Sequence, residues 1–134
     1  MVSVQDFNRI DEENCSIVQQ FTNLFYGGMD RKRETLGLFY VDESPSFVWN
    51  GNTCEGIDDI LRFTTTIPET QHVVQSIDVQ RIPDSHSGMD CCLITHVGGS
   101  VTVGGEVHAF TQTFTLSKEG GKHKIKSNRF RYCD

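Results

Sequence analysis

The sequence predicts an α+β fold in which helices pack on one face of an antiparallel sheet. Helical spacing of apolar residues is confined to the first half of the chain, up to about residue 66. From about residue 72 onward, Val, Ile and Thr alternate in extended runs that Gly-containing turns separate. Helices followed by strands, rather than alternating with them, are typical of the α+β class. A chain of 134 residues corresponds to one domain, which we expect to span residues 1–134.

An amphipathic helix is predicted over residues 5–26. Its later apolar residues follow the i, i+1, i+4, i+7, i+8 pattern of one helical stripe, formed by Ile17, Val18, Phe21, Leu24 and Phe25. The pair Gly27-Gly28 is expected to end this helix. A second, shorter helix is predicted over residues 29–38 with Asp30 as its N-cap. Its basic run at residues 31–33 is interpreted as solvated surface.

A hairpin followed by a third helix is predicted between residues 46 and 66. The Asn50-Gly51 pair suits a two-residue turn, because both central positions need a positive φ. Apolar spacing from Ile57 predicts a helix with Asp58 and Asp59 in its first turn. The helix dipole explains these two carboxylates better than an acid–base pair does. Trp49, in the first strand of the hairpin, is expected in the core.

Long strands are predicted over residues 72–82, 89–97 with a continuation at 101–103, 107–116 and 122–132. The pair Gly98-Gly99 indicates a bulge or bend. In the third run, Phe110, Phe114 and Leu116 alternate with Thr111, Thr113 and Thr115. The Phe face belongs to the core, and the opposite face mixes Thr with apolar and charged residues. Such a semi-polar face suits a protein partner better than solvent.

Composition restricts the classes of function. A net charge of −6 disfavours direct nucleic-acid binding, because phosphate contacts dominate that affinity. The five cysteines show no metal-ligand spacing, so no metal and no cofactor are expected, and buried free thiols in a reducing compartment are favoured. No secretory pattern and no apolar run of membrane-spanning length is present in the sequence. An intracellular, soluble protein without membrane insertion is therefore expected.

Several motifs in the correct order make the chain resemble the nuclear transport factor 2 family, and within it the export branch. They are residues 38–41 (LFYV), 48–52 (VWNGN), Ile67-Pro68, residues 110–114 (FTQTF) and 127–132 (SNRFRY). The resemblance implies a cone-shaped α+β fold whose curved sheet wraps the first helix and whose outer surface dimerises. Two residues depart from the family pattern, because His123 replaces a usual Trp and Asn128 a common Asp.

The resemblance also implies a function. Members of the export branch are non-enzymatic adaptors that pair with the matching domain of the large messenger RNA export receptor. The heterodimer binds Phe-Gly repeats of nuclear pore proteins, touches RNA only indirectly, and shuttles between nucleus and cytoplasm through the nuclear pore. The first alternative is a homodimeric import carrier for GDP-bound Ran. The second is an isomerase or dehydratase in the cone, for which Tyr40 with Asp42 or Asp90 can be assembled on paper.

Four residues are the candidate partner contacts: Asp78, Thr113, Arg129 and Arg131. Arg131 matches a branch arginine that pairs with an acid across the dimer. With Phe130 pointing to the core, alternation directs Arg129 and Arg131 to the outer face. Asp78 is the candidate opposite charge, since an acid within a strand is disfavoured unless partnered. For each charged residue, simple solvation is the alternative. Phe7 is a further candidate contact for Phe-Gly repeats, although core or cap packing is favoured there.

Overall fold

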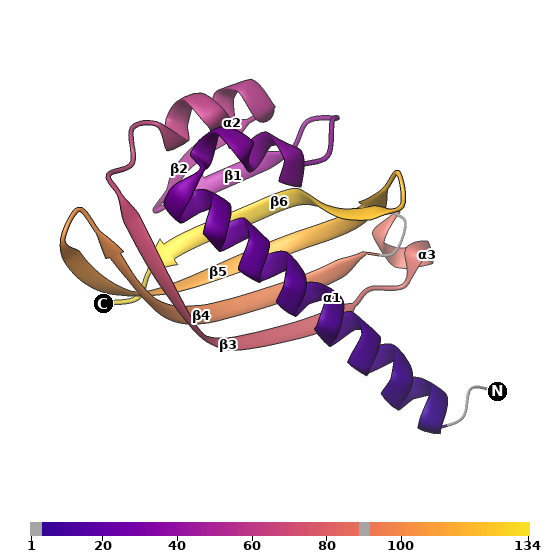
Figure 1. Ribbon diagram of the computed structural model, residues 1–134. Coiled ribbons are helices and arrows are strands. Elements are labelled where there is room, and N and C mark those ends of the chain that lie inside the picture. Colours follow the sequence, from indigo (N-terminus) through magenta and orange to yellow (C-terminus); the bar gives the residue numbers. More distant parts are fainter. Residues whose placement is uncertain (1–3, 89–91) are drawn as a thin grey trace.

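The computed structural model describes residues 4–88 and 92–134, with the side chains of residues 4–11 and 87 excepted. One long helix, α1, lies across a curved sheet of six strands, and the smaller helices lie at its ends (Figure 1). The predicted α+β class is confirmed. Phe7 and Asp90 lie outside the described side chains, as does the start of the strand predicted from residue 89.

Helix α1 covers Val4–Arg31 and continues through Gly27-Gly28, so the predicted helix end there is wrong. Neither glycine has a positive φ. A Cβ on Gly28 would lie 3.3 Å from the Thr35 hydroxyl, so this glycine allows the following segment to pack closely. That segment is a 3-10 helix, η1 (Arg33–Phe39), instead of the predicted α-helix over residues 29–38. Asp30 is therefore no N-cap, because it lies in the last turn of α1.

The predicted hairpin and third helix are confirmed. Strands β1 (Ser46–Trp49) and β2 (Asn52–Glu55) pair antiparallel, and α2 (Ile57–Thr64) follows. Asn50 and Gly51 both have positive φ, +46° and +88°, as the turn requires. In the first turn of α2, the carboxylate of Asp59 accepts a hydrogen bond from the Glu55 amide at 3.1 Å.

The sheet continues with β3 (Thr70–Arg81), β4 (Leu93–Val103), β5 (Glu106–Glu119) and β6 (Lys122–Tyr132). A one-turn helix, α3 (Asp84–Ser87), separates β3 from β4 and was not predicted. The strand order is β2-β1-β6-β5-β4-β3, and β1 runs parallel to β6. The sheet is therefore mixed, with this one parallel pair among otherwise antiparallel neighbours. No tight turn connects β1 to β6, so local turn signals do not set their relative direction.

The core lies between α1 and the inner face of the sheet. Phe21 and Phe25 of α1 meet the ring of Phe114 edge-on, with centroids 5.7 and 5.1 Å away. Phe114 is fully buried, which confirms the predicted alternation along β5. Trp49 stacks on Phe130 with centroids 4.0 Å apart, and it is 8% exposed. The prediction that Trp49 belongs to the core is confirmed.

A β-bulge in β3 changes which side chains face the core. Val74 pairs with Gly99 and Ser76 with Gly98, so Gln75 is an extra residue opposite the predicted Gly pair. Beyond the bulge, Ile77 packs against the core as Val74 does, while Asp78 is exposed. Strict alternation along the predicted strand 72–82 would place Val74 and Asp78 on one face, but the inserted residue puts them on opposite faces.

Candidate protein-interaction face

The outer face of the sheet, turned away from α1, carries all four predicted contact residues. Three of them share one cross-strand row. Asp78 of β3 pairs with His96 of β4, which pairs with Thr113 of β5, which pairs with Arg129 of β6. The row ends on β1, where Val48 is the neighbour of Arg129. We call these five residues the charged row.

Side-chain contacts within the charged row are few. His96 Nδ1 lies 3.0 Å from the Thr113 hydroxyl. Asp78 and Arg129 are separated by three strand spacings, about 14 Å, which is too far for an ion pair within the chain. In the part of the chain that the structure describes, neither residue forms an ion pair. The row therefore presents a negative and a positive end, both exposed.

Arg131 lies on the same face, two residues beyond Arg129 along β6. Its register partner is Thr111 of β5, and both residues are exposed. The Cys133 thiol lies 3.6 Å from the Thr111 hydroxyl, so Cys133 belongs to this face too. The alternation that predicted outward-pointing Arg129 and Arg131 holds for both residues.

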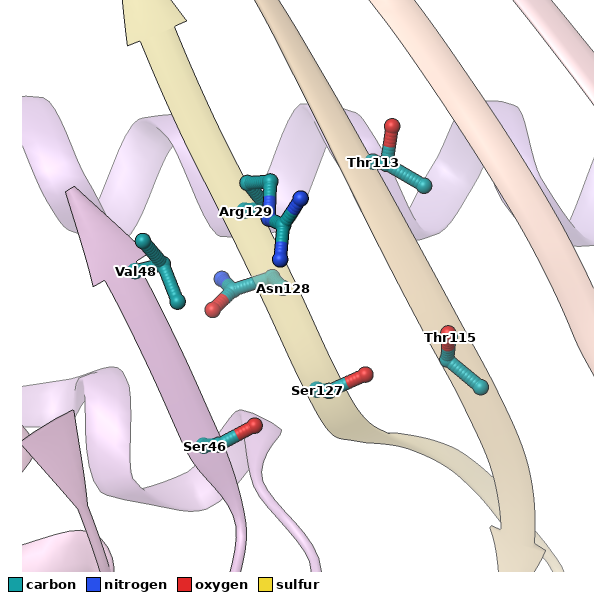
Figure 2. A pocket seen from close by; sticks show the side chains of 7 residues that line it. All are labelled: Ser46, Val48, Thr113, Thr115, Ser127, Asn128 and Arg129. Atoms are coloured by element: carbon teal, nitrogen blue, oxygen red, sulfur yellow. The ribbon is translucent and has the colours of Figure 1, made fainter. Parts of the chain in front are cut away.

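Two adjoining hollows mark the β1 and β6 side of the outer face. The first, about 380 Å³, is seen in Figure 2 and is lined by Ser46, Val48, Thr113, Thr115, Ser127, Asn128 and Arg129. We call it the Arg129 hollow. The second, about 530 Å³, surrounds the hairpin turn and is lined by Val48, Asn50, Gly51, Thr53, Arg129, Phe130, Arg131 and Tyr132. A guanidinium therefore borders each hollow.

The rest of the outer face is threonine-rich and partly apolar. Thr111, Thr113 and Thr115 follow β5, and the apolar side chains of Val73 and Val107 are 54% and 69% exposed. Protein-binding surfaces combine such apolar area with charged and hydroxyl groups at the rim. In this composition the outer face differs from the inner face, which is rich in aromatic residues.

A polar network closes one end of the cone around Asp30 and His72. The Asp30 carboxylate lies 2.6 Å from His72 Nδ1 and accepts hydrogen bonds from the His72 amide at 2.9 Å and the Thr70 hydroxyl at 2.8 Å. Burial alone would raise the pKa of Asp30, but the hydrogen bonds and charge of His72 outweigh it and leave this pKa below its usual value. The Tyr26 ring packs on His72 with centroids 4.6 Å apart. The His72 side chain is 1% exposed, so this network is structural packing.

Arg33 has a structural role that sequence reasoning missed. It donates hydrogen bonds to the backbone carbonyls of Met29 and Thr64, each at 2.9 Å, and to those of Ile67 and Pro68. These bonds fasten the loop between α2 and β3 to the end of α1. The prediction of solvated surface holds for Arg31 and Lys32, which are exposed, but is wrong for Arg33.

Of the two acid–base pairs considered for an enzyme, the Tyr40–Asp42 pair is not assembled, and the Tyr40–Asp90 pair lies partly outside the described residues. Its ring is 1% exposed, and its hydroxyl accepts a hydrogen bond from Asn128 Nδ2 at 3.1 Å. Burial raises the pKa of Tyr40 well above its usual value. Asp42, by contrast, is exposed on the surface. Asn128, the departure from the family pattern, thus serves to hold a buried tyrosine.

Comparison with known proteins agrees with this geometry. The sequence model of the nuclear transport factor 2 (NTF2) domain family matches residues 17–132 of this chain. The NTF2-related export protein of Caenorhabditis elegans is 46% identical over 136 residues, which cover all of this chain and 98% of that protein. NTF2-related export protein 2 of Homo sapiens is 28% identical, with 100% and 97% covered. The chain therefore belongs to the nuclear transport factor 2 family.

A solved structure shows the same fold. Nuclear transport factor 2 from Cryptosporidium parvum superimposes with a TM-score of 0.78 at 22% identity, covering 90% of this chain and 95% of that one. The predicted cone-shaped fold of this family is confirmed.

In the described residues, no helix is both long and apolar enough to span a bilayer.

Proposed function

We propose that this chain is the small, non-enzymatic subunit of a heterodimeric messenger RNA export receptor. Its outer face covers the sheet of the matching domain in the large receptor. The observation that carries the proposal is the charged row, in which Asp78 and Arg129 present opposite charges that nothing in the described chain neutralises. The 46% identity to a protein named for export supports the same role.

The adaptor role is mechanical and thermodynamic. A partner that binds only the folded form stabilises that form by mass action, so each subunit supports the fold of the other. We propose that the heterodimer offers weak, multivalent contacts to Phe-Gly repeats and shuttles through the nuclear pore. RNA is engaged through the large subunit, in keeping with the net charge of −6.

The import-carrier alternative needs an apolar cavity rimmed by acidic side chains that receives a switch-loop aromatic of Ran. Here large side chains occupy the interior, where Phe25, Tyr40 and Phe110 are at most 2% exposed. This packing favours the adaptor over the carrier.

The test is a binding titration with the matching domain of the large receptor from the same organism. Arg131→Asp and Asp78→Arg should each weaken the complex at least about 30-fold, as expected when one partner of a buried charge pair is lost. Asp58→Arg, which changes an exposed residue on α2, is the matched control and should bind as wild type does. Unchanged affinity for both interface variants would reject these contacts, and tight binding to GDP-bound Ran would favour the alternative.

A further inference from the structure

The Arg129 hollow is lined by hydrogen-bond donors, and within the described residues only the side chains of Thr113 and Asn128 among them have a partner. Four hydroxyl side chains, those of Ser46, Thr113, Thr115 and Ser127, surround it together with the Arg129 guanidinium. Figure 2 shows these side chains projecting from β1, β5 and β6 around one depression of the outer face. The four hydroxyl residues are half-buried. A hollow of this kind is chemically suited to an anion.

No carboxylate of the described chain fills it. The lining holds a guanidinium, hydroxyls, an amide and the methyl groups of Val48, but no acid. Across the residues that the structure describes, the side chains of Arg129, Ser46, Thr115 and Ser127 appear in no hydrogen bond or ion pair. A planar guanidinium fits a carboxylate through two parallel N–H···O bonds, and nearby hydroxyls can donate to the remaining lone pairs.

The charge of the surroundings selects the type of anion. A single guanidinium matches a singly charged group, whereas a nucleic-acid backbone requires a run of cations. Asp78 stands about 14 Å away on the same row, and the chain carries a net charge of −6, so a polyanion would be repelled. A carboxylate on an opposing protein surface fits these conditions.

We propose that the Arg129 hollow receives an Asp or Glu side chain of the large receptor's matching domain, held by the guanidinium and the Ser46 and Ser127 hydroxyls. The inference rests on the proposed function and adds a second anchor, distinct from the Arg131 contact that the family resemblance implies. It assigns to the hollow a specificity role, because an apolar or basic side chain placed there would leave Arg129 buried and unpaired.

Three variants test the anchor in a titration against the large receptor's matching domain. Arg129→Met, which keeps length and loses charge, should weaken binding at least about 30-fold. Arg129→Lys keeps the charge but loses the planar guanidinium and its two parallel hydrogen bonds. Its affinity should lie between those of Arg129→Met and wild type. Arg62→Met is the matched control, because Arg62 lies on α2 and its side chain is 76% exposed, and it should bind like wild type. Thermal unfolding of each variant alone shows that it is folded.

Rescue identifies the carboxylate. Arg129→Asp should bind poorly, and replacing one acidic residue of the partner's sheet by Arg should restore binding at least tenfold. Wild-type affinity for Arg129→Met overturns the anchor, as does a weakened Arg129→Asp that no partner variant rescues. The anchor would also be overturned if Arg129→Met reduced the amount of RNA that the complex retains and left the affinity for the partner domain unchanged. If the wild-type chain itself fails to bind the partner domain, the proposed function fails instead.

Discussion

Replacing Gly99 by Ala tests whether the bulge in β3 fixes the layout of the outer face. An added Cβ on Gly99 would lie 2.0 Å from the Val73 carbonyl oxygen. Carbon and oxygen atoms of neighbouring strands approach to about 3.3 Å, so the Val73 peptide would have to retreat by more than 1 Å. A backbone carbonyl cannot rotate away as a side chain can, and its movement strains the pairing of β3 with β4.

The cost follows from that displacement. Overpacking of this kind costs about 1–3 kcal/mol, and a weakened ladder hydrogen bond adds about 1 kcal/mol. We expect Gly99→Ala to lower the free energy of unfolding by about 3 kcal/mol, which for a chain of this length lowers Tm by about 10 °C. Urea and thermal unfolding followed by circular dichroism measure both quantities.

Gly98→Ala is the matched control, because its added Cβ would meet only the Ser76 hydroxyl, at 2.9 Å. That side chain can turn to another rotamer, so we expect a cost of about 1 kcal/mol or less. Equal stability of the two variants would refute the reasoning, since it would show that the bulge does not depend on the close approach at Gly99.

The remaining predictions concern the polar network around Asp30 and the hydrogen bonds that Arg33 donates to backbone carbonyls. Because the pKa of Asp30 is lowered on folding, its ionised form stabilises the fold above the unfolded-state pKa, and this contribution is lost as pH falls through the lower folded-state value. The stability advantage of wild type over Asp30→Asn should therefore shrink below about pH 4 in urea unfolding, and a constant difference from pH 2 to 7 would contradict the role of His72. Arg33→Ala should lower the free energy of unfolding by about 3 kcal/mol, because its hydrogen bonds to the carbonyls are lost. Lys32→Ala, which changes an exposed residue, should change it by no more than about 0.5 kcal/mol in the same assay. Similar values for the two variants would reject the structural role of Arg33.

Local patterns predicted much of the fold. The Phe110 and Phe114 alternation identified the core face of β5, and Asn50-Gly51 identified the hairpin, because both signals depend only on neighbouring residues. The outward direction of Arg129 and Arg131 followed from the same alternation.

The errors came from tertiary contacts. The helix continues through Gly28 because close packing against η1 outweighs the low helix propensity of glycine. Gln75 inserts a residue into β3, and no count of alternating residues can detect it. Arg33 binds carbonyls of residues 64 to 68, which are more than thirty positions away in the chain, so nothing in its basic neighbourhood indicates that role.

The sequence proposed residues for the candidate site but gave no geometry for them. The residues Asp78, Thr113 and Arg129 came from charge, alternation and family resemblance, whereas their alignment in one row depends on the register of four strands and on the bulge. The hollow beside Arg129 also depends on the parallel pairing of β1 with β6, which brings Ser46 next to Ser127. No local signal in the sequence encodes that pairing.

Cysteine labelling measures most directly whether a partner covers the outer face. Cys133 is exposed on that face, and Cys15 is exposed on α1, so the chain carries its own probe and control. Maleimide labelling of each thiol, followed by mass spectrometry, compares the free chain with its complex with the large receptor's matching domain. We predict that Cys133 reacts in the free chain and is protected in the complex, while Cys15 reacts equally in both. Equal labelling of Cys133 in the free and bound chain would contradict the account.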